Sequence, residues 1–160
     1  MTNKHHHYTL DVTWTGNNGI GTENYEVYSR SHSIRSAEKP IIEASSDAAF
    51  RGDIEKYNPE ELFVASLSSC HMLWYLHLCA DNDIVVHAYT DKPEGTLTEP
   101  ASGPGHFSSV TLHPVVMVAE EWMQEKAVQL HEEAHKRCFI ANSCNFPVAV
   151  QALCTVGTLS

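Results

Sequence analysis

The feature that most constrains the fold is a run from Leu62 to Ala80 without a single Asp, Glu, Lys or Arg. A Pro-Glu-Glu segment at residues 59–61 comes just before it. Proline is favoured at the first helical position, and carboxylates in the first turn face the positive end of the helix dipole. The sequence therefore predicts a helix over residues 59–80. Because a helix that is apolar nearly all round must be buried on several sides, we expect it at the centre of the molecule, with Cys70 inside it.

This run is also close to the length that spans a lipid bilayer. It carries several polar side chains, namely Ser66, Ser68, Ser69, His71 and His77. Its flanking segments are not basic, whereas loops at a membrane border carry an excess of Lys and Arg. We therefore predict the central helix of a soluble protein with no membrane partner. Packing between subunits is expected to cover the side that one chain leaves open.

Chain length and net charge limit which class of protein this can be. A chain of 160 residues is one domain of ordinary size, and folding it buries roughly 70% of its unfolded surface. We predict a single domain over residues 1–160, with residues 1–7 flexible. The formal net charge is −10, and the 10 basic residues are scattered rather than gathered in a stripe. Nucleic acid is therefore not an expected partner, because phosphate binding needs clustered cations.

The cysteine content and the N-terminus indicate the compartment. The chain has 5 cysteines, an odd number, and it begins Met-Thr-Asn-Lys-His-His-His without the apolar stretch of a signal peptide. We predict a cytoplasmic protein whose thiols are free at rest. The histidines at residues 5–7 could bind metal adventitiously, although a mobile N-terminus explains them as well.

Hydrophobic spacing predicts the remaining elements. Met123, Ala127, Leu130, Ala134 and Cys138 recur at three- and four-residue intervals, so they share one face of a second helix over residues 120–137. Strand patterns and turn residues predict a hairpin of residues 8–14 and 24–30, a loop over 31–57, a hairpin of 84–90 and 107–118 with its turn at 99–105, and a last strand over 147–158. Grouped hairpins with two helices predict an α+β fold, with antiparallel β-sheets packed around two central helices rather than a parallel sheet of βαβ units.

Two cysteines lie in contexts that suggest a reactive thiol pair. Cys70 is in the middle of the first predicted helix, and Cys138 is at the C-terminal end of the second. Exposed carbonyl groups at a helix C-terminus disfavour a thiolate. This asymmetry favours Cys70 as the attacking thiol and Cys138 as the resolving thiol.

The same segments resemble the OsmC/Ohr family. The similarity rests on the Asn58-Pro-Glu-Glu-Leu helix start, the cysteine ten residues after Glu60, and the Ala134-His-Lys-Arg-Cys helix end, and it covers most of the chain. The resemblance implies an intertwined homodimer with active sites at the subunit interface. It also implies a cofactor-free antioxidant enzyme of the oxidative stress response, a peroxidase that reduces organic hydroperoxides and is itself reduced by a dithiol such as a lipoyl group. Phe139 follows Cys138 here, where many members have proline.

A cysteine in mid-helix gains little from the helix dipole, so Cys70 needs a cation to favour its thiolate. The resemblance implies that Arg51, paired with Glu60, does this, since a bidentate clamp needs one specific guanidinium. Arg30 and Arg35 are alternatives to Arg51.

Ten helical residues from Glu60 to Cys70 rise roughly 15 Å, too far for both side chains to serve one small substrate. Either the first helical turn departs from the helix, or Glu60 of one subunit faces Cys70 of its partner across a twofold axis. An apolar pocket that prefers organic hydroperoxides is expected from the aromatic and aliphatic residues near these segments, Leu62, Phe63, Trp74 and Phe139.

The other three cysteines are predicted to pack. Cys79 lies about half a turn round the helix from Cys70, and Cys154 lies in the last strand. Cys144 could replace Cys138 as the resolving thiol, but packing is favoured because free cysteine is commonly buried.

Two other functions compete with the peroxidase. His131-Glu132-Glu-Ala-His135 matches the zinc-hydrolase pattern, with two imidazoles on one helical face and Glu132 as a base. A catalytic zinc site needs a third protein ligand, however, and no residue other than Cys138 has a claim to that position. His135 is more simply explained as packing or support beside Cys138. The second alternative is a redox-inert protein of the same fold that binds a small apolar ligand.

Overall fold

The structure, a computed structural model, describes residues 3–158. Residues 1–7 were predicted to be flexible, and the first two of them lie outside this range. The chain divides into two compact units, one up to Leu62 and one from Phe63 onward, which are described separately. The prediction of one domain over the whole chain stays a prediction.

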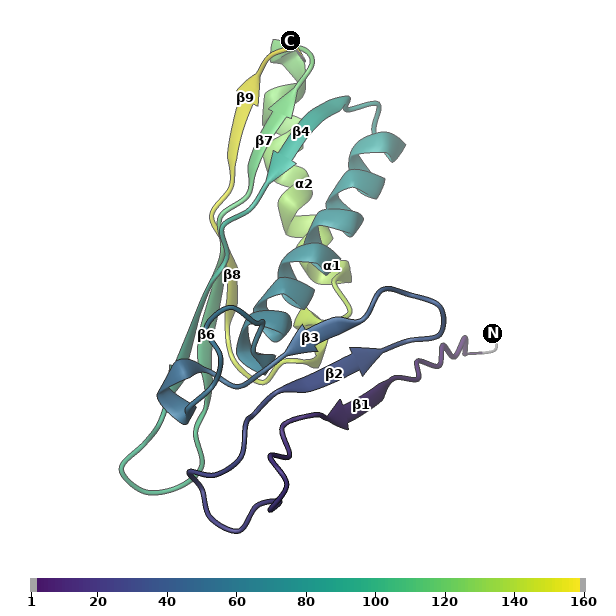
Figure 1. Cartoon of the computed structure of the whole chain (residues 1–160). Helices are drawn as coiled ribbons and strands as arrows, with labels where there is room; N and C mark the ends of the chain where they lie inside the picture. The colour runs from purple at the N-terminus through teal and green to yellow at the C-terminus, as the bar shows by residue number, and fades with distance from the viewer. Residues whose placement is uncertain (1–2, 159–160) are drawn as a thin grey trace. The chain divides into compact units, whose positions relative to one another are not determined.

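The first unit holds a three-stranded antiparallel sheet in the order β1-β2-β3 (Figure 1). Its strands are β1 (Asp11–Trp14), β2 (His32–Arg35) and β3 (Ile42–Ala44), and the short 3-10 helix η1 (Ala48–Phe50) follows. The predicted partner of the first strand, residues 24–30, is wrong, because β1 pairs with β2. The segment predicted to be mostly loop therefore supplies two of the three strands.

Residues 24–30 are held in an irregular loop by side-chain contacts. The Asn24 side-chain oxygen accepts a hydrogen bond from the Glu26 N–H at 2.9 Å, an Asx-turn that bends the chain. The Arg30 guanidinium lies over the rings of Tyr25 and Tyr28, 4.2 and 4.1 Å from their centroids. It also donates hydrogen bonds to both tyrosine carbonyl groups. The tyrosines that resemble a strand pattern thus enclose a cation.

The first long helix, α1 (Pro59–Asp81), confirms the predicted helix and its proline start. Asn58 caps it in a reciprocal arrangement. The Asn58 side-chain oxygen accepts from the Glu61 N–H at 2.8 Å, and the Glu61 carboxylate accepts from the Asn58 N–H at 3.0 Å. Among the described residues, α1 is the one helix whose length and apolar composition would suffice to cross a membrane, a test that core helices of soluble proteins also pass.

The second unit contains two three-stranded sheets, ordered β4-β7-β9 and β5-β6-β8. Figure 1 shows them following one another as a long layer, with α1 and the second helix on one side. The elements are β4 (Val86–Thr90), β5 (Glu94–Thr98), β6 (His106–Leu112), β7 (Val115–Val118), η2 (Glu121–Met123), α2 (Gln124–Arg137), η3 (Ala141–Ser143), β8 (Val148–Val150) and β9 (Leu153–Val156).

The prediction of purely antiparallel sheets is wrong for the last strands. β8 pairs with β6, and β9 with β7, in parallel register. The reason is that α2 connects β7 to β8 as a crossover, which returns the chain in the same direction. β5, which pairs with β6, was not predicted as a strand.

The predicted strand over residues 107–118 is interrupted at His113 and Pro114. Asp91 stabilises this interruption, because its carboxylate accepts from the His113 N–H at 2.7 Å and from the Ser68 hydroxyl at 2.5 Å. Asp91 therefore joins α1 to the sheet at the level where the strands change from one sheet to the other.

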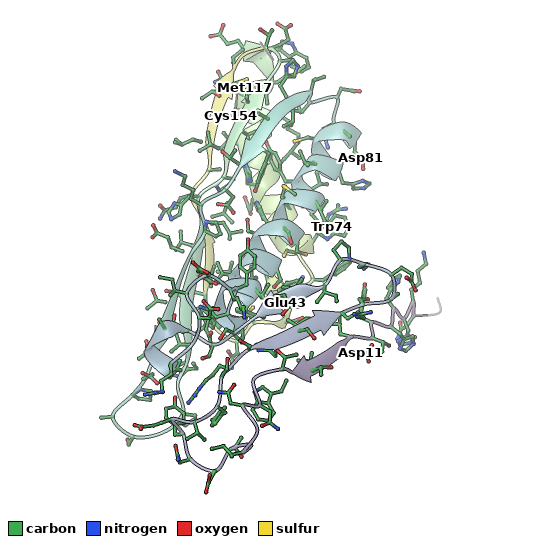
Figure 2. The ribbon with its side chains drawn as sticks, viewed as in Figure 1. Asp11, Glu43, Trp74, Asp81, Met117 and Cys154 are labelled. Atoms are coloured by element: carbon green, nitrogen blue, oxygen red, sulfur yellow. The ribbon has the colours of Figure 1, made fainter. Side chains whose placement is uncertain are left out.

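The core of the second unit lies between the helices and the sheet. Figure 2 shows Trp74 and Asp81 along α1, and Met117 and Cys154 on the sheet. The predicted face of the second helix is confirmed, because all five of its residues are buried. α1 buries a single stripe of residues, Leu67, His71, Tyr75, Leu78 and Cys79, rather than several sides. Leu73, outside this stripe, is 63% exposed, so a covering subunit stays a prediction.

Candidate active site

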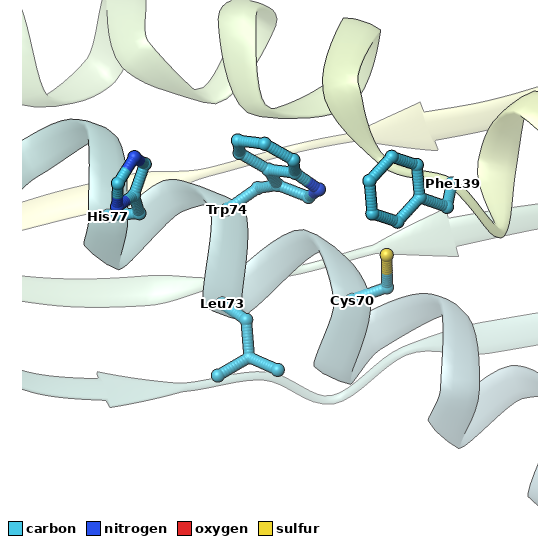
Figure 3. Close-up of a pocket in the computed structure, with 5 residues that line it drawn as sticks. All are labelled: Cys70, Leu73, Trp74, His77 and Phe139. Carbon is cyan, nitrogen blue, oxygen red and sulfur yellow. The ribbon is translucent and has the colours of Figure 1, made fainter. Parts of the chain in front are cut away.

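Cys70 is half-buried and lies in an apolar pocket of about 330 Å³ in the second unit. The other lining residues are Leu73, Trp74, His77 and Phe139. Figure 3 shows the Cys70 sulfur directed toward the Phe139 ring, with Trp74 beside that ring and His77 beyond it.

The local sequence builds this pocket. Cys70, Leu73, Trp74 and His77 follow one another at helical spacing, so they share a face of α1 different from the buried stripe. The Trp74 ring packs edge-on against Phe139, with centroids 5.6 Å apart. The walls of the pocket are mainly apolar, and the Arg137 guanidinium lies over the Trp74 ring, 5.8 Å from its centroid.

Cys138 lies beside Cys70 at the end of α2 and is only 1% exposed. The pKa of the Cys138 thiol is raised to about 11, chiefly by burial and in part by the neighbouring Cys70, while hydrogen bonds from the Ala141 and Ile140 backbone act in the opposite direction. The Ala141 N–H lies 3.4 Å from the Cys138 sulfur. Cys138 is therefore a protonated thiol at neutral pH, next to a more accessible one.

Arg51 lies in the first unit, at the end of η1, with a left-handed backbone (φ 64°). Its guanidinium makes no ion pair or hydrogen bond with residues 3–158 of the structure. The loop around it is tightly built, because a Cβ on the next residue, Gly52, would come within 1.6 Å of the Ser46 carbonyl oxygen. Asp47 caps η1 by accepting from the Ala49 N–H at 2.7 Å. Arg51 is thus held on a defined loop with its charged end available.

The two alternative arginines differ in their availability. Arg30 is enclosed by two tyrosines and donates to their carbonyl groups, so it would have to leave these contacts to reach a thiolate. Arg35, at the end of β2, is exposed. The arginine that serves Cys70 stays a prediction.

Glu60 lies in the first turn of α1, which is helical from Pro59 onward. The option in which this turn departs from the helix is therefore wrong. Glu60 and Cys70 of one chain remain about 15 Å apart along the axis. Its neighbour Glu61 holds the helix cap, which leaves the Glu60 carboxylate for another role.

Two of the predicted pocket residues are not among those that line it. Phe63 packs on Phe107 and Phe146, with centroids 5.0 and 6.0 Å away, in the part of the core formed with β6. Leu62 does not line the pocket either. Leu73 and His77, which sequence reasoning missed, lie three and seven residues after Cys70, and this helical spacing could have identified them.

The remaining cysteines pack as predicted. Cys79 is buried in the core, and the half-buried Cys154 packs against the same cluster. The Cys144 thiol is half-buried and donates to the Ile140 carbonyl at 3.2 Å. Replacement of Cys138 by Cys144 as the resolving thiol stays a prediction.

The zinc-hydrolase pattern lies on α2, where its residues make other contacts. His131 is buried with its Nδ1 3.0 Å from the His71 Nε2, and Glu132 pairs with Lys136 at 2.9 Å. Between residues 3 and 158, no three His, Cys, Asp or Glu side chains are grouped closely enough to hold a metal ion. The pattern therefore lacks the three ligands of a catalytic zinc site.

Comparison with known proteins identifies the family. The family model described as OsmC-like protein matches residues 52–152. The chain belongs to the OsmC-like family. The resemblance seen in the sequence is thus confirmed, as is a mixed α+β fold with two main helices. This family includes members that metabolise hydroperoxides.

Several solved structures share this OsmC-like fold. An OsmC-like protein of unknown function from Vibrio cholerae is 30% identical with a TM-score of 0.83, and the match covers 93% of this chain and 100% of that one. An organic hydroperoxide resistance protein from Elizabethkingia anophelis is 20% identical with a TM-score of 0.66, covering 95% and 99% of the two chains. An OsmC-like protein from Mycoplasma pneumoniae is 14% identical with a TM-score of 0.70, covering 97% and 99%. A search of curated proteins gave no match.

Proposed function

We propose that this OsmC-like protein is a thiol-dependent peroxidase of organic hydroperoxides. The observation that carries the proposal is the placement of Cys70 in an apolar pocket next to the buried Cys138 thiol. Similar folds named as organic hydroperoxide resistance proteins support the same activity. Apolar walls favour a peroxide with an organic substituent over hydrogen peroxide.

The proposed reaction has two chemical steps. The Cys70 thiolate attacks the terminal oxygen of the hydroperoxide, the O–O bond breaks, and the alkoxide leaves as an alcohol after taking a proton, so that Cys70 becomes a sulfenic acid. The Cys138 thiol then attacks the Cys70 sulfur, forming a disulfide and releasing water. The high pKa of Cys138 supports this order, because a protonated thiol is a poor first nucleophile.

Arg51 and Glu60 are proposed to orient the peroxide and to stabilise the Cys70 thiolate. The available guanidinium of Arg51 and the uncommitted carboxylate of Glu60 support these roles. Because Glu60 cannot reach Cys70 along a single α1, the proposal requires a homodimer in which one subunit completes the site of the other. The exposed apolar side chains beside the pocket, Leu73 and Phe139, support such a contact.

A dithiol such as a lipoyl group is proposed to reduce the disulfide and complete the cycle. The free state of all five cysteines supports work in the reducing cytoplasm.

Turnover of an alkyl hydroperoxide with a dithiol reductant tests the proposal. Cys70→Ser is expected to abolish turnover, whereas Cys154→Ser, a matched change at a packing cysteine, should retain it. Mass spectrometry after one equivalent of peroxide should show a Cys70–Cys138 disulfide. Full activity in the Cys70→Ser variant would refute the assignment, and peroxide-inert thiols would favour a ligand-binding protein instead.

A further inference from the structure

Residues 24–30, the loop found in place of a predicted strand, also contact the segment that carries Arg51. The Tyr25 hydroxyl donates a hydrogen bond to the Phe50 carbonyl oxygen at 3.3 Å, across 25 positions of the chain. Phe50 comes directly before Arg51, and all of these residues belong to the first unit. A tyrosine outside every motif of the sequence thus contacts the backbone next to the arginine that the proposed function uses.

Tyr25 is itself held in place by Arg30. The Arg30 guanidinium lies over the Tyr25 ring, 4.2 Å from its centroid, and donates to the Tyr25 carbonyl oxygen at 2.6 Å. It makes the same two contacts with Tyr28, at 4.1 and 2.5 Å. A planar guanidinium that stacks on rings and donates in two directions fixes both partners. The Tyr25 hydroxyl is therefore presented by a loop that several contacts order, even though this side chain is 55% exposed.

The backbone of Arg51 needs support from its surroundings. Its φ of 64° is in the left-handed region, where a residue with a side chain persists only when neighbouring contacts hold it. The Arg51 N–H donates to the Ala48 carbonyl oxygen at 3.0 Å. The Phe50 carbonyl group, part of the peptide bond that leads into Arg51, accepts from the Ser46 hydroxyl at 3.2 Å as well as from Tyr25. Ser46 belongs to the same turn as Arg51, whereas Tyr25 joins this turn to a distant segment.

We propose that Tyr25 is a positioning residue, which fixes the Phe50–Arg51 peptide bond and thereby sets where the Arg51 guanidinium meets the peroxide. The inference rests on the proposed function, in which Arg51 orients the substrate. Arg30 acts one step further away, because it holds the ring and the carbonyl group of Tyr25. Arg30 thus serves Arg51 instead of replacing it. Misplacement of an orienting group by about 1 Å can slow a reaction 100-fold, so loss of this support should be measurable.

Trypsin cleavage of the native protein after Arg51 tests the contact without any enzyme activity. Tyr25→Phe keeps the ring beneath Arg30 and removes only the hydroxyl. Because a lost hydrogen bond makes local opening more frequent, this variant should be cut at Arg51 roughly 3- to 5-fold faster. Tyr28→Phe is the matched control. Its ring stacks on Arg30 in the same way, but the Tyr28 hydroxyl has no hydrogen-bond partner within residues 3–158, so cleavage should proceed at the unchanged rate.

Turnover of an alkyl hydroperoxide tests the consequence for the reaction. Tyr25→Phe should lower kcat/KM for the peroxide roughly 10-fold, whereas Tyr28→Phe should retain it. Arg51→Gln should itself be impaired. In that background Tyr25→Phe should cause no further loss, because a residue that acts only through Arg51 has no effect once the guanidinium is gone. A merely structural role would lower kcat/KM by the same factor in both backgrounds.

The outcomes separate this inference from the peroxidase itself. In an active protein, an unchanged cleavage rate at Arg51 or an unchanged kcat/KM in Tyr25→Phe would overturn the inference. Full activity of Arg51→Gln, or an equal further loss in that background, would overturn it as well, while turnover that depends on Cys70 would leave the peroxidase in place. A protein without peroxidase activity would instead refute the proposed function, and trypsin cleavage would still decide whether Tyr25 supports Arg51.

Discussion

Acid should destabilise this protein through the buried His71–His131 pair. Burial lowers the pKa of His71 to about 4 and that of His131 to about 3, from an ordinary value of 6.5. In His71, the neighbouring His135 contributes part of the lowering of the pKa, and Asp91 acts in the opposite direction. Between pH 6.5 and 4, these two imidazoles therefore bind protons in the unfolded chain but not in the folded chain. Stability is fully present above pH 6.5 and is lost as the pH falls.

The size of this effect follows from the linkage relation. At pH 5, each imidazole that stays neutral costs about 2 kcal/mol of unfolding free energy relative to pH 7.5, so the pair costs at most about 4 kcal/mol. His131→Phe preserves a ring stacked on Tyr75 but removes one titrating group. We expect it to roughly halve the loss between the two pH values.

Urea unfolding at pH 7.5 and pH 5, followed by circular dichroism, measures the effect. The exposed His106→Ala is the control and should lose as much stability as the unchanged protein. If His131→Phe lost as much stability at pH 5 as the control, the buried pair would not be the source of acid sensitivity, and the reasoning would be refuted.

Three further predictions concern the helix cap and the two cysteine sites. Asn58→Ala should lower the unfolding free energy by about 1 kcal/mol in urea, because it breaks the cap with Glu61, and an unchanged midpoint would contradict this role. Iodoacetamide at pH 8 should modify Cys70 in the reduced folded protein well before Cys138. With a pKa near 11, only about one Cys138 thiol in a thousand is ionised at this pH. Peptide mass spectrometry measures the two rates, and equal rates would disprove the assigned difference. Phe139→Ala should lower kcat/KM for an aromatic hydroperoxide roughly 10-fold while leaving that for hydrogen peroxide nearly unchanged, since it removes an apolar wall, and a parallel loss for both peroxides would count against a specificity role.

Structural features that arise from short-range sequence patterns were predicted correctly. The start of α1 follows from proline and carboxylates within one turn, and the buried face of α2 follows from the spacing of five residues. Both depend on neighbours within a few positions along the chain. The failure at residues 24–30 shows the limit, because Tyr25 and Tyr28 fit a strand pattern but instead enclose Arg30.

The sequence by itself determined the two helices, the cysteines they carry and the family, since these rest on short-range spacing and on motifs. Only the tertiary structure decided that β8 and β9 run parallel to their neighbours, that Phe63 packs on Phe107 and Phe146 rather than lining the Cys70 pocket, and that His131 contacts His71. These features join residues that are far apart in the chain. Their partners are selected by packing and burial over the whole unit, which no local pattern encodes.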